Sequence, residues 1–161
     1  MLRRSPPRIR PALKSDAAVI AEVLGRAFAE YRPLYTPGGF AATAINAEQV
    51  LERMQEGPVW VAVEAEQIVG TVAAVLQPGN KCYLRGMAIL PEARGGGIGP
   101  LLLAAVEDFA RHSGAEALTL STTPFLDRAI RLYERASFLR NPESQHDLYG
   151  TPLFTMSKKL L

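Results

Sequence analysis

Apolar residues in the N-terminal part of the chain recur at helical spacing in two segments. A potential N-cap at Ser15-Asp16 precedes the first segment, which predicts a first helix with an apolar face. That face would consist of Val19, Ile20, Val23, Leu24 and Ala27. A second helix is predicted over Ala47 to Gln55, capped by Asn46 and ended by Gly57-Pro58. Ahead of both helices, Arg8 to Pro11 is expected to be short and extended, because proline disfavours helix in the residue before it.

The segment Tyr31 to Asn46, between these two helices, combines helix breakers with aromatic residues. The breakers are Pro33, Pro37, Gly38 and Gly39, and they predict a loop. Its aromatic residues are Tyr31, Tyr35 and Phe40. Two interpretations stand side by side: the aromatic side chains line a binding site, or they cover the hydrophobic core.

The middle of the chain is rich in β-branched residues and predicts three consecutive antiparallel strands. Val59 to Val63 and Ile68 to Leu76 are joined by a short polar link, which is typical of a hairpin. A turn at Pro78-Gly79-Asn80 then leads into a third strand over Lys81 to Leu90.

The pattern changes after residue 97 to helices alternating with strands. An amphipathic helix is predicted from Ile98 to about His112, followed by a short strand over Ala117 to Ser121. A strand, helix and strand in this order favour parallel pairing with a right-handed connection. A last helix is predicted from about Asp127 to Ala136, and a final strand over Leu153 to Met156. The predicted fold class is therefore α/β, with a mixed sheet that is antiparallel first and parallel later.

Length and composition favour one soluble domain. The chain has 161 residues, of which 48% are hydrophobic and 21% charged, as in ordinary globular proteins. We expect a basic and flexible tail over residues 1–7 and a single domain over residues 8–161. No apolar run approaches the roughly 20 residues that a membrane helix needs, and the N-terminus lacks the apolar region of a secretory signal. We therefore expect a cytoplasmic protein that binds no membrane.

Charge and rare residues exclude several kinds of site. A net charge of +2 gives a weak field, so nucleic-acid binding is not expected. The single cysteine, Cys82, has no recognisable histidine partner, which favours a core or strand thiol over a nucleophile. The two histidines lack the spacing of a metal site, so no metal is expected.

The most informative segment is the glycine-rich turn that starts at Arg94 and precedes the predicted long helix. Four glycines in and around this turn would let backbone N–H groups converge on a ligand, and the start of the helix adds unpaired donors. They are Gly95, Gly96, Gly97 and Gly99. Such a turn predicts an anion site suited to phosphate or pyrophosphate. Neither the spacing of a dinucleotide fingerprint nor the Gly-Lys-Ser/Thr ending of a nucleotide P-loop is present.

Two motifs together resemble the GCN5-related N-acetyltransferase (GNAT) family. Arg94-x-x-Gly97-x-Gly99 matches its pyrophosphate loop, Gln/Arg-x-x-Gly-x-Gly/Ala. The segment from Ala129 to Phe138 looks like its Ala-x-x-Leu-Tyr-x-x-x-Gly-Phe segment. With the order of elements, the resemblance covers nearly all of Arg8 to Lys159. It implies a three-layer fold: a mixed, mostly antiparallel sheet with a splayed parallel pair and helices on both faces.

By this resemblance the cosubstrate is acetyl-CoA, and the enzyme transfers its acetyl group to a primary amine by direct attack in a ternary complex. The pyrophosphate would bind the glycine-rich turn, and the pantetheine arm would follow the strand over Leu84 to Leu90, with amides near Ala88 and Ile89 polarising the thioester carbonyl. The implied cofactor-binding residues are Met87, Ala88, Ile89, Arg94, Gly95, Gly96, Gly97, Ile98, Gly99 and Pro100. Tyr133 is the implied catalytic acid that returns a proton to sulfur, with a core aromatic as the alternative interpretation.

The chain departs from the family pattern at three positions. Ser137 stands where the family usually has glycine. Leu126 stands where many members carry an asparagine that contacts the cofactor, so we expect that contact to be absent. Pro100 follows the last motif glycine and removes one N–H, although proline suits the first turn of a helix.

The acceptor and the general base are not specified by the residues. We expect a small-molecule amine, bound by Tyr31, Tyr35 and Phe40 together with a loop over Asn141 to Pro152. A protein or peptide acceptor and a non-catalytic acyl-CoA-binding module are the alternatives. The candidates for the base, by residue type only, are Glu30, Glu64, His146 and Asp147, and a water chain would serve equally well. The resemblance also allows a homodimer.

Overall fold

The computed structural model describes residues 6–160, so residues 1–5 of the predicted basic tail lie outside the described part of the chain. Its strands are β1 (Arg8–Pro11), β2 (Val59–Glu64), β3 (Gln67–Gln77), β4 (Lys81–Ile89), β5 (Ala117–Thr122), β6 (Leu139–Leu148) and β7 (Thr151–Lys159). Its helices are α1 (Ala17–Phe28), α2 (Pro37–Thr43), α3 (Ala47–Glu56), α4 (Ile98–His112) and α5 (Asp127–Arg135). Short 3-10 turns cover Lys14–Asp16 (η1), Ala29–Leu34 (η2) and Pro91–Ala93 (η3).

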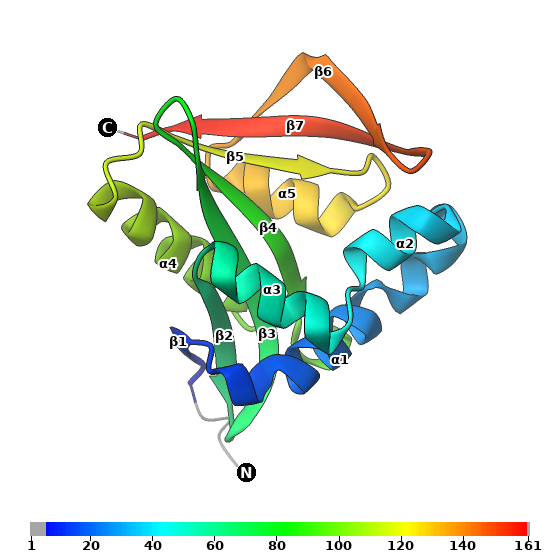
Figure 1. Cartoon of the computed structure of the whole chain (residues 1–161), viewed down its shortest axis with the longest axis vertical. Helices are drawn as coiled ribbons and strands as arrows, with labels where there is room; N and C mark the ends of the chain where they lie inside the picture. Colours follow the sequence, from blue (N-terminus) through cyan, green and yellow to red (C-terminus); the bar gives the residue numbers. More distant parts are fainter. Residues whose placement is uncertain (1–5, 161) are drawn as a thin grey trace.

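Within residues 6–160, one mixed sheet of seven strands, in the order β1-β2-β3-β4-β5-β7-β6, organises the fold (Figure 1). Strands β4 and β5 run parallel, and the other neighbouring strands are antiparallel. Helices α1 and α3 lie in front of β2, β3 and β4 in Figure 1, whereas α4 and α5 lie behind the sheet. The three layers and the parallel pair agree with the fold class expected from the sequence.

The apolar faces predicted for the helices form the core on both sides of the sheet. The fully buried side chains of α1 and α3 meet the front of the sheet, and those of α4 meet its back. The largest of these side chains are Ile20, Val23, Leu24, Val50, Ile98 and Leu102, with Val61, Val72, Leu84, Leu118, Leu120 and Met156 from the sheet. Cys82 is also fully buried, and burial raises the pKa of its thiol to about 11, which is unsuitable for a nucleophile.

Strands β4 and β5 separate partway along their length. Their register covers only Lys81 with Ala117, Cys82 with Leu118 and Tyr83 with Thr119. Beyond this point β4 continues to Ile89, while β5 continues to Thr122 against β7. The sheet therefore opens between the two strands, and main-chain groups on the facing edges are left without a ladder partner.

Two segments that were expected to be loops are regular elements, and these expectations were wrong. Pro37 begins α2, because proline is accepted at the first helical position and the Thr36 hydroxyl accepts a hydrogen bond from the Gly39 amide at 3.0 Å. Residues 141–152 belong to the antiparallel hairpin of β6 and β7. Strand β6 is polar because it forms the edge of the sheet and is largely exposed, so its residues show no apolar alternation.

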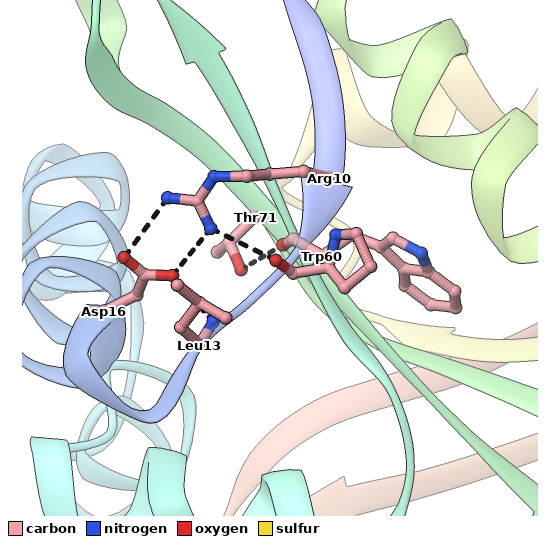
Figure 2. A network of polar contacts seen from close by, with 6 residues as sticks. Arg10, Leu13, Asp16, Trp60 and Thr71 are labelled. Carbon is pink, nitrogen blue, oxygen red and sulfur yellow. Dashed lines mark hydrogen bonds and ion pairs between the residues drawn. The ribbon is translucent and has the colours of Figure 1, made fainter.

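The chain that enters the first helix is held by a two-point ion pair, shown in Figure 2. The Arg10 guanidinium on β1 donates to both carboxylate oxygens of Asp16, at 2.8 and 3.2 Å. Asp16 also accepts the Leu13 amide at 2.7 Å. These contacts join the outer strand to the start of α1 and lower the pKa of Asp16, chiefly through the Arg10 hydrogen bond.

Candidate active site

A cavity of about 840 Å³ lies at the opening between β4 and β5 and collects most of the residues singled out in the sequence. The predicted cofactor residues that line it are Met87, Ala88, Ile89, Arg94, Gly95, Gly97, Ile98, Gly99 and Pro100, whereas Gly96 does not. Tyr133, Tyr31 and Tyr35 line the same cavity, and Phe40 does not. Residues more than 100 positions apart thus converge on one space.

The glycine-rich turn between η3 and α4 has the backbone geometry of an anion cradle. Gly95 and Gly97 have φ values of 82° and 80°, a region that side chains rarely adopt, and Cβ atoms there would meet nothing within 4 Å. Gly97 is the N-cap of α4 and offers no side chain to the first amides of the helix. Among the described residues, the loop and turn hydrogen bonds between backbone groups use none of the Gly95, Gly96 and Gly97 amides as donors. Open space and unpaired amides occur together at the positive end of a 15-residue helix.

Gly99, the last glycine of the motif, has a different role. A Cβ atom at this position would lie 2.9 Å from Leu132 Cδ2, so the glycine lets α4 and α5 approach closely. Leu132 directly precedes Tyr133 in the sequence. The contact therefore couples the position of the glycine-rich turn to that of the candidate catalytic tyrosine.

Arg94, the first residue of the motif, is bound to the opposite wall of the cavity. Its guanidinium donates to the Glu30 carboxylate at 2.5 Å and to the Ala27 carbonyl oxygen at 3.1 Å. Because Ala27 lies in the last turn of α1 and Glu30 near the start of η2, these bonds join the glycine-rich turn to the front layer. In this arrangement Arg94 positions the turn, and the backbone amides remain as the groups facing the ligand space.

Strand β4 carries a bulge where it borders the cavity. Thr71 pairs with Ala88 and Ala73 with Arg85, so Gly86 and Met87 together oppose one residue of β3. Further along, the Leu90 amide donates to the Val69 carbonyl at 2.8 Å, towards β3. Since successive amides of a strand point to opposite sides, the Ile89 amide is directed to the open β5 side.

Tyr133 is buried on α5, with its ring 5.8 Å from that of Phe138 in an edge-to-face contact. Burial raises the pKa of its hydroxyl above the ordinary value, and the neighbouring Tyr83 and Tyr35 add to the rise. The hydroxyl is therefore protonated throughout the neutral pH range. Its place in the cavity wall shows that packing in the core and access to a ligand are compatible for this residue.

The aromatic residues Tyr31, Tyr35 and Phe40 belong to a cluster of rings beside the cavity that also includes Phe125. Tyr35 is buried and contacts Phe125 and Phe40 edge to face, with ring centroids 4.9 and 6.0 Å apart. Tyr31 lies 6.2 Å from Phe125, at the cavity. Phe40 stands behind Tyr35 and is covered by the Arg32 guanidinium, 4.9 Å from its ring centre. Tyr31 and Tyr35 thus line the cavity, while Phe40 supports Tyr35.

Several cavity residues gave no usable signal in the sequence. Arg53, Tyr83 and Arg85 line the cavity from α3 and β4, and Leu148 and Leu153 line it from the β6–β7 hairpin. Gly86, inside a predicted strand, is the one signal that could have indicated the bulge. The four residues considered as a general base, Glu30, Glu64, His146 and Asp147, all lie outside the cavity lining.

Within residues 6–160 no three metal-ligating side chains lie close enough together to hold an ion. No helix in the same part of the chain has the length and apolar character to cross a membrane.

Solved structures with similar folds include two determined with coenzyme A ligands. The PaiA N-acetyltransferase of Thermoplasma acidophilum, in complex with coenzyme A, superposes with a TM-score of 0.82 at 18% identity, over 97% of this chain and 100% of that chain. The putative acetyltransferase yncA of Salmonella typhimurium, with acetyl-CoA, gives 0.74 at 20% identity, over 98% and 95% of the two chains.

Relatives in sequence identify the family as well as the fold. An uncharacterized N-acetyltransferase of Escherichia coli K12, YjgM, is 31% identical over 82% of this chain and 81% of its own length. An uncharacterized N-acetyltransferase of Bacillus subtilis 168, YhfO, is 31% identical over 89% and 97%. The model of the acetyltransferase (GNAT) family matches residues 24–138, which include both motifs and the cavity residues of α1, β4, α4 and α5. With the sheet, the glycine-rich turn and these matches in agreement, the chain belongs to the GNAT family of acetyltransferases.

Proposed function

We propose that the protein transfers the acetyl group of acetyl-CoA to the primary amine of a small molecule by direct attack in a ternary complex. The observation that carries this proposal is the meeting of three features at one cavity: the glycine-rich turn, the free edge of β4 and the protonated Tyr133. Each supplies a different requirement of acyl transfer from a thioester, namely anion binding, carbonyl polarisation and a proton.

The residues present fit acetyl-CoA. The amides of Gly95, Gly97 and Ile98 would hold the pyrophosphate, because the turn leaves them open and no side chain could fill the space without strain. The Ile89 N–H would donate a hydrogen bond to the thioester oxygen on the open side of β4, where β5 no longer pairs with β4. Acetyl-CoA supplies the acetyl group in activated form. Pro100 has no N–H, so the amide cradle ends one residue earlier than in a helix without this proline.

Tyr133 is the proposed proton donor. The acceptor nitrogen forms its bond to the acetyl carbon as the carbon–sulfur bond breaks, and the leaving sulfur gains a proton. Burial keeps the tyrosine hydroxyl protonated until that moment, since it raises the pKa of the group. The amine must lose a proton as well. The only carboxylate among the described cavity residues, Glu107, is already paired with Arg111 and Lys158, which favours water as the path for that proton.

A small acceptor is favoured over a peptide by the way the cavity is walled. The Thr36 amide donates to Thr151 Oγ1 at 2.9 Å, and the Thr36 hydroxyl donates to the Tyr149 carbonyl at 2.8 Å. These bonds fasten the start of α2 to the β6–β7 turn, the two elements beside each other at the right of Figure 1. Ala42 and Thr43 of α2 and Leu148 of the hairpin line the cavity behind this contact. A cavity wall whose two elements are hydrogen-bonded to each other suits a compact amine better than an extended peptide.

The test is release of free thiol from acetyl-CoA in the presence of acceptor panels. We expect thiol release that depends on small primary amines and forms the matching N-acetyl product. Turnover confined to peptides would show that the acceptor is a peptide or protein and not a small molecule. Tight acetyl-CoA binding without release by any amine or peptide would instead favour a non-catalytic acyl-CoA-binding module.

A further inference from the structure

Two arginine side chains from different layers line the same cavity and lie close enough for their charges to repel. Arg53 comes from α3, Arg85 comes from β4, and both line the cavity. The bulge in β4 makes their approach feasible: a Cβ atom on Gly86 would lie 2.6 Å from Arg53 Nη1, so the arginine occupies the space that the glycine leaves. Arg53 therefore rests directly on the strand beside Arg85.

The positive charge of this pair is only partly compensated. Arg85 pairs with Glu56 at 3.0 Å, but its Nε atom is buried without a hydrogen-bond partner. Among the described residues Arg53 forms no ion pair at contact distance, but Glu56, the partner of Arg85, is near enough to favour its charge. Burial lowers the pKa of Arg53 to about 10, and repulsion from Arg85 contributes to the lowering. Two guanidinium groups thus share one carboxylate in a half-buried place, which is unfavourable unless an anion joins them.

The pair is separate from the predicted pyrophosphate cradle. Gly86, Met87 and Ala88 separate Arg85 from Ile89 along β4, and the cradle begins only beyond Ile89 and η3. Arg94, the arginine of the cradle, is already bound to Glu30. The uncompensated charge at Arg53 and Arg85 therefore lies towards α3, apart from the cradle. The space over Gly86 does not explain the presence of an arginine at position 53. An apolar side chain there would fill the same space without charge repulsion from Arg85.

We infer that Arg53 and Arg85 form a carboxylate receptor for the acceptor, so that the preferred substrates are small amino carboxylates such as amino acids. This inference rests on the proposed function and specifies its substrate class. A planar guanidinium fork matches a carboxylate through two parallel hydrogen bonds, and the protein itself leaves the Arg85 Nε without a partner. Tyr83, on the same strand as Arg85, also lines the cavity.

The test measures binding of reaction products to the protein saturated with coenzyme A. The probes are the N-acetyl derivatives of the twenty standard amino acids and, for each, the matching primary amide that lacks the carboxylate charge. Titration calorimetry is run on the wild type, Arg53→Gln, Arg53→Lys and Arg85→Gln, with thermal unfolding to confirm that each variant folds. Arg8→Gln removes an exposed arginine on β1 and serves as the control.

We expect at least one N-acetyl amino acid to bind at least tenfold more tightly than its amide. This preference should disappear in Arg53→Gln and Arg85→Gln, shrink in Arg53→Lys and persist in Arg8→Gln, with coenzyme A affinity unchanged in all four. The inference is overturned if no acid binds better than its amide, or if the preference survives both glutamine variants. Failure of coenzyme A itself to bind the wild type would instead contradict the proposed function.

Discussion

Tyr133 is the residue whose chemical role depends most directly on its surroundings. It lies on the buried face of α5, where core packing alone would account for a tyrosine. The pKa of its hydroxyl is raised by burial and by two neighbouring tyrosines, and the residue borders the cavity. A core position and the proposed proton donation are therefore compatible in one arrangement.

The hydroxyl of Tyr133 can be removed without removing its ring. We expect Tyr133→Phe to lower turnover at least tenfold and to leave acetyl-CoA affinity nearly unchanged, because the ring still packs on Phe138 while the donor is lost. Steady-state kinetics and titration calorimetry check the two halves of this expectation. Tyr149→Phe, at a side chain that is 73% exposed, is the control. Unchanged turnover in Tyr133→Phe would remove this residue from the mechanism.

Ser137 shows the cost of one departure from the family pattern. Its φ of 75° lies in the left-handed region, directly after α5, where the family usually has glycine. Glycine at position 137 removes the strain of a side chain in this region but increases the conformational entropy of the unfolded chain. We expect the first effect to be the larger, so Ser137→Gly should raise the free energy of unfolding by about 0.5–1 kcal/mol. Urea unfolding measures this.

The matched control for Ser137 is Ser113, which closes α4 with a φ of −87°. Ser113→Gly relieves no strain and should be neutral or destabilising. Equal effects of the two substitutions would show that the backbone conformation at Ser137 carries no cost.

At the scale of elements, the spacing of apolar residues was sufficient to predict a helix or strand wherever that element has one buried face. Helices α1, α3 and α4 and strands β2, β3 and β4 follow the predicted segments within a few residues, because their apolar positions face the core. Helix α2 and strand β6 escaped prediction for a shared reason. Both lie at the margin of the fold and are specified by contacts with partners distant in sequence, such as Thr36 with Thr151.

The link between β1 and α1 gives an element-scale prediction with a definite pH dependence. Asp16 has a lowered pKa in the folded protein because of the Arg10 hydrogen bonds, and its side chain is 12% exposed. Asp16→Asn should lower the free energy of unfolding by about 1 kcal/mol at pH 7. A lowered folded pKa stabilises above the ordinary value of 3.8, and this stabilisation is lost as pH falls below 3.8 through the folded value.

Chemical unfolding at pH 7 and at several lower pH values compares the wild type with Asp16→Asn. The two proteins should converge in acid. Asp108→Asn, at an exposed carboxylate of α4, should show no such convergence. A difference between wild type and Asp16→Asn that stays constant with pH would show that the ion pair is not its cause.

At the scale of the whole molecule, the candidate active site lies where β4 and β5 separate. The glycine-rich turn could be recognised from the sequence because its chemistry is local: glycines, a helix start and a preceding strand lie within ten residues. The Arg53 and Arg85 pair could not, since it depends on the β4 bulge and on the packing of α3 over Gly86. Local motifs thus predicted the cosubstrate, whereas the proposed acceptor class rests on the assembled layers.

The central claim is that the cavity binds acetyl-CoA through the glycine-rich turn, and isothermal titration tests it most directly. The comparison pairs Gly97→Glu with Gly114→Glu, because both glycines have φ near 80° and open surroundings but lie at opposite ends of α4. Micromolar binding to the wild type and to Gly114→Glu, with loss of binding in a folded Gly97→Glu, is the predicted result. No binding to the wild type, or equal binding to Gly97→Glu, would contradict the account.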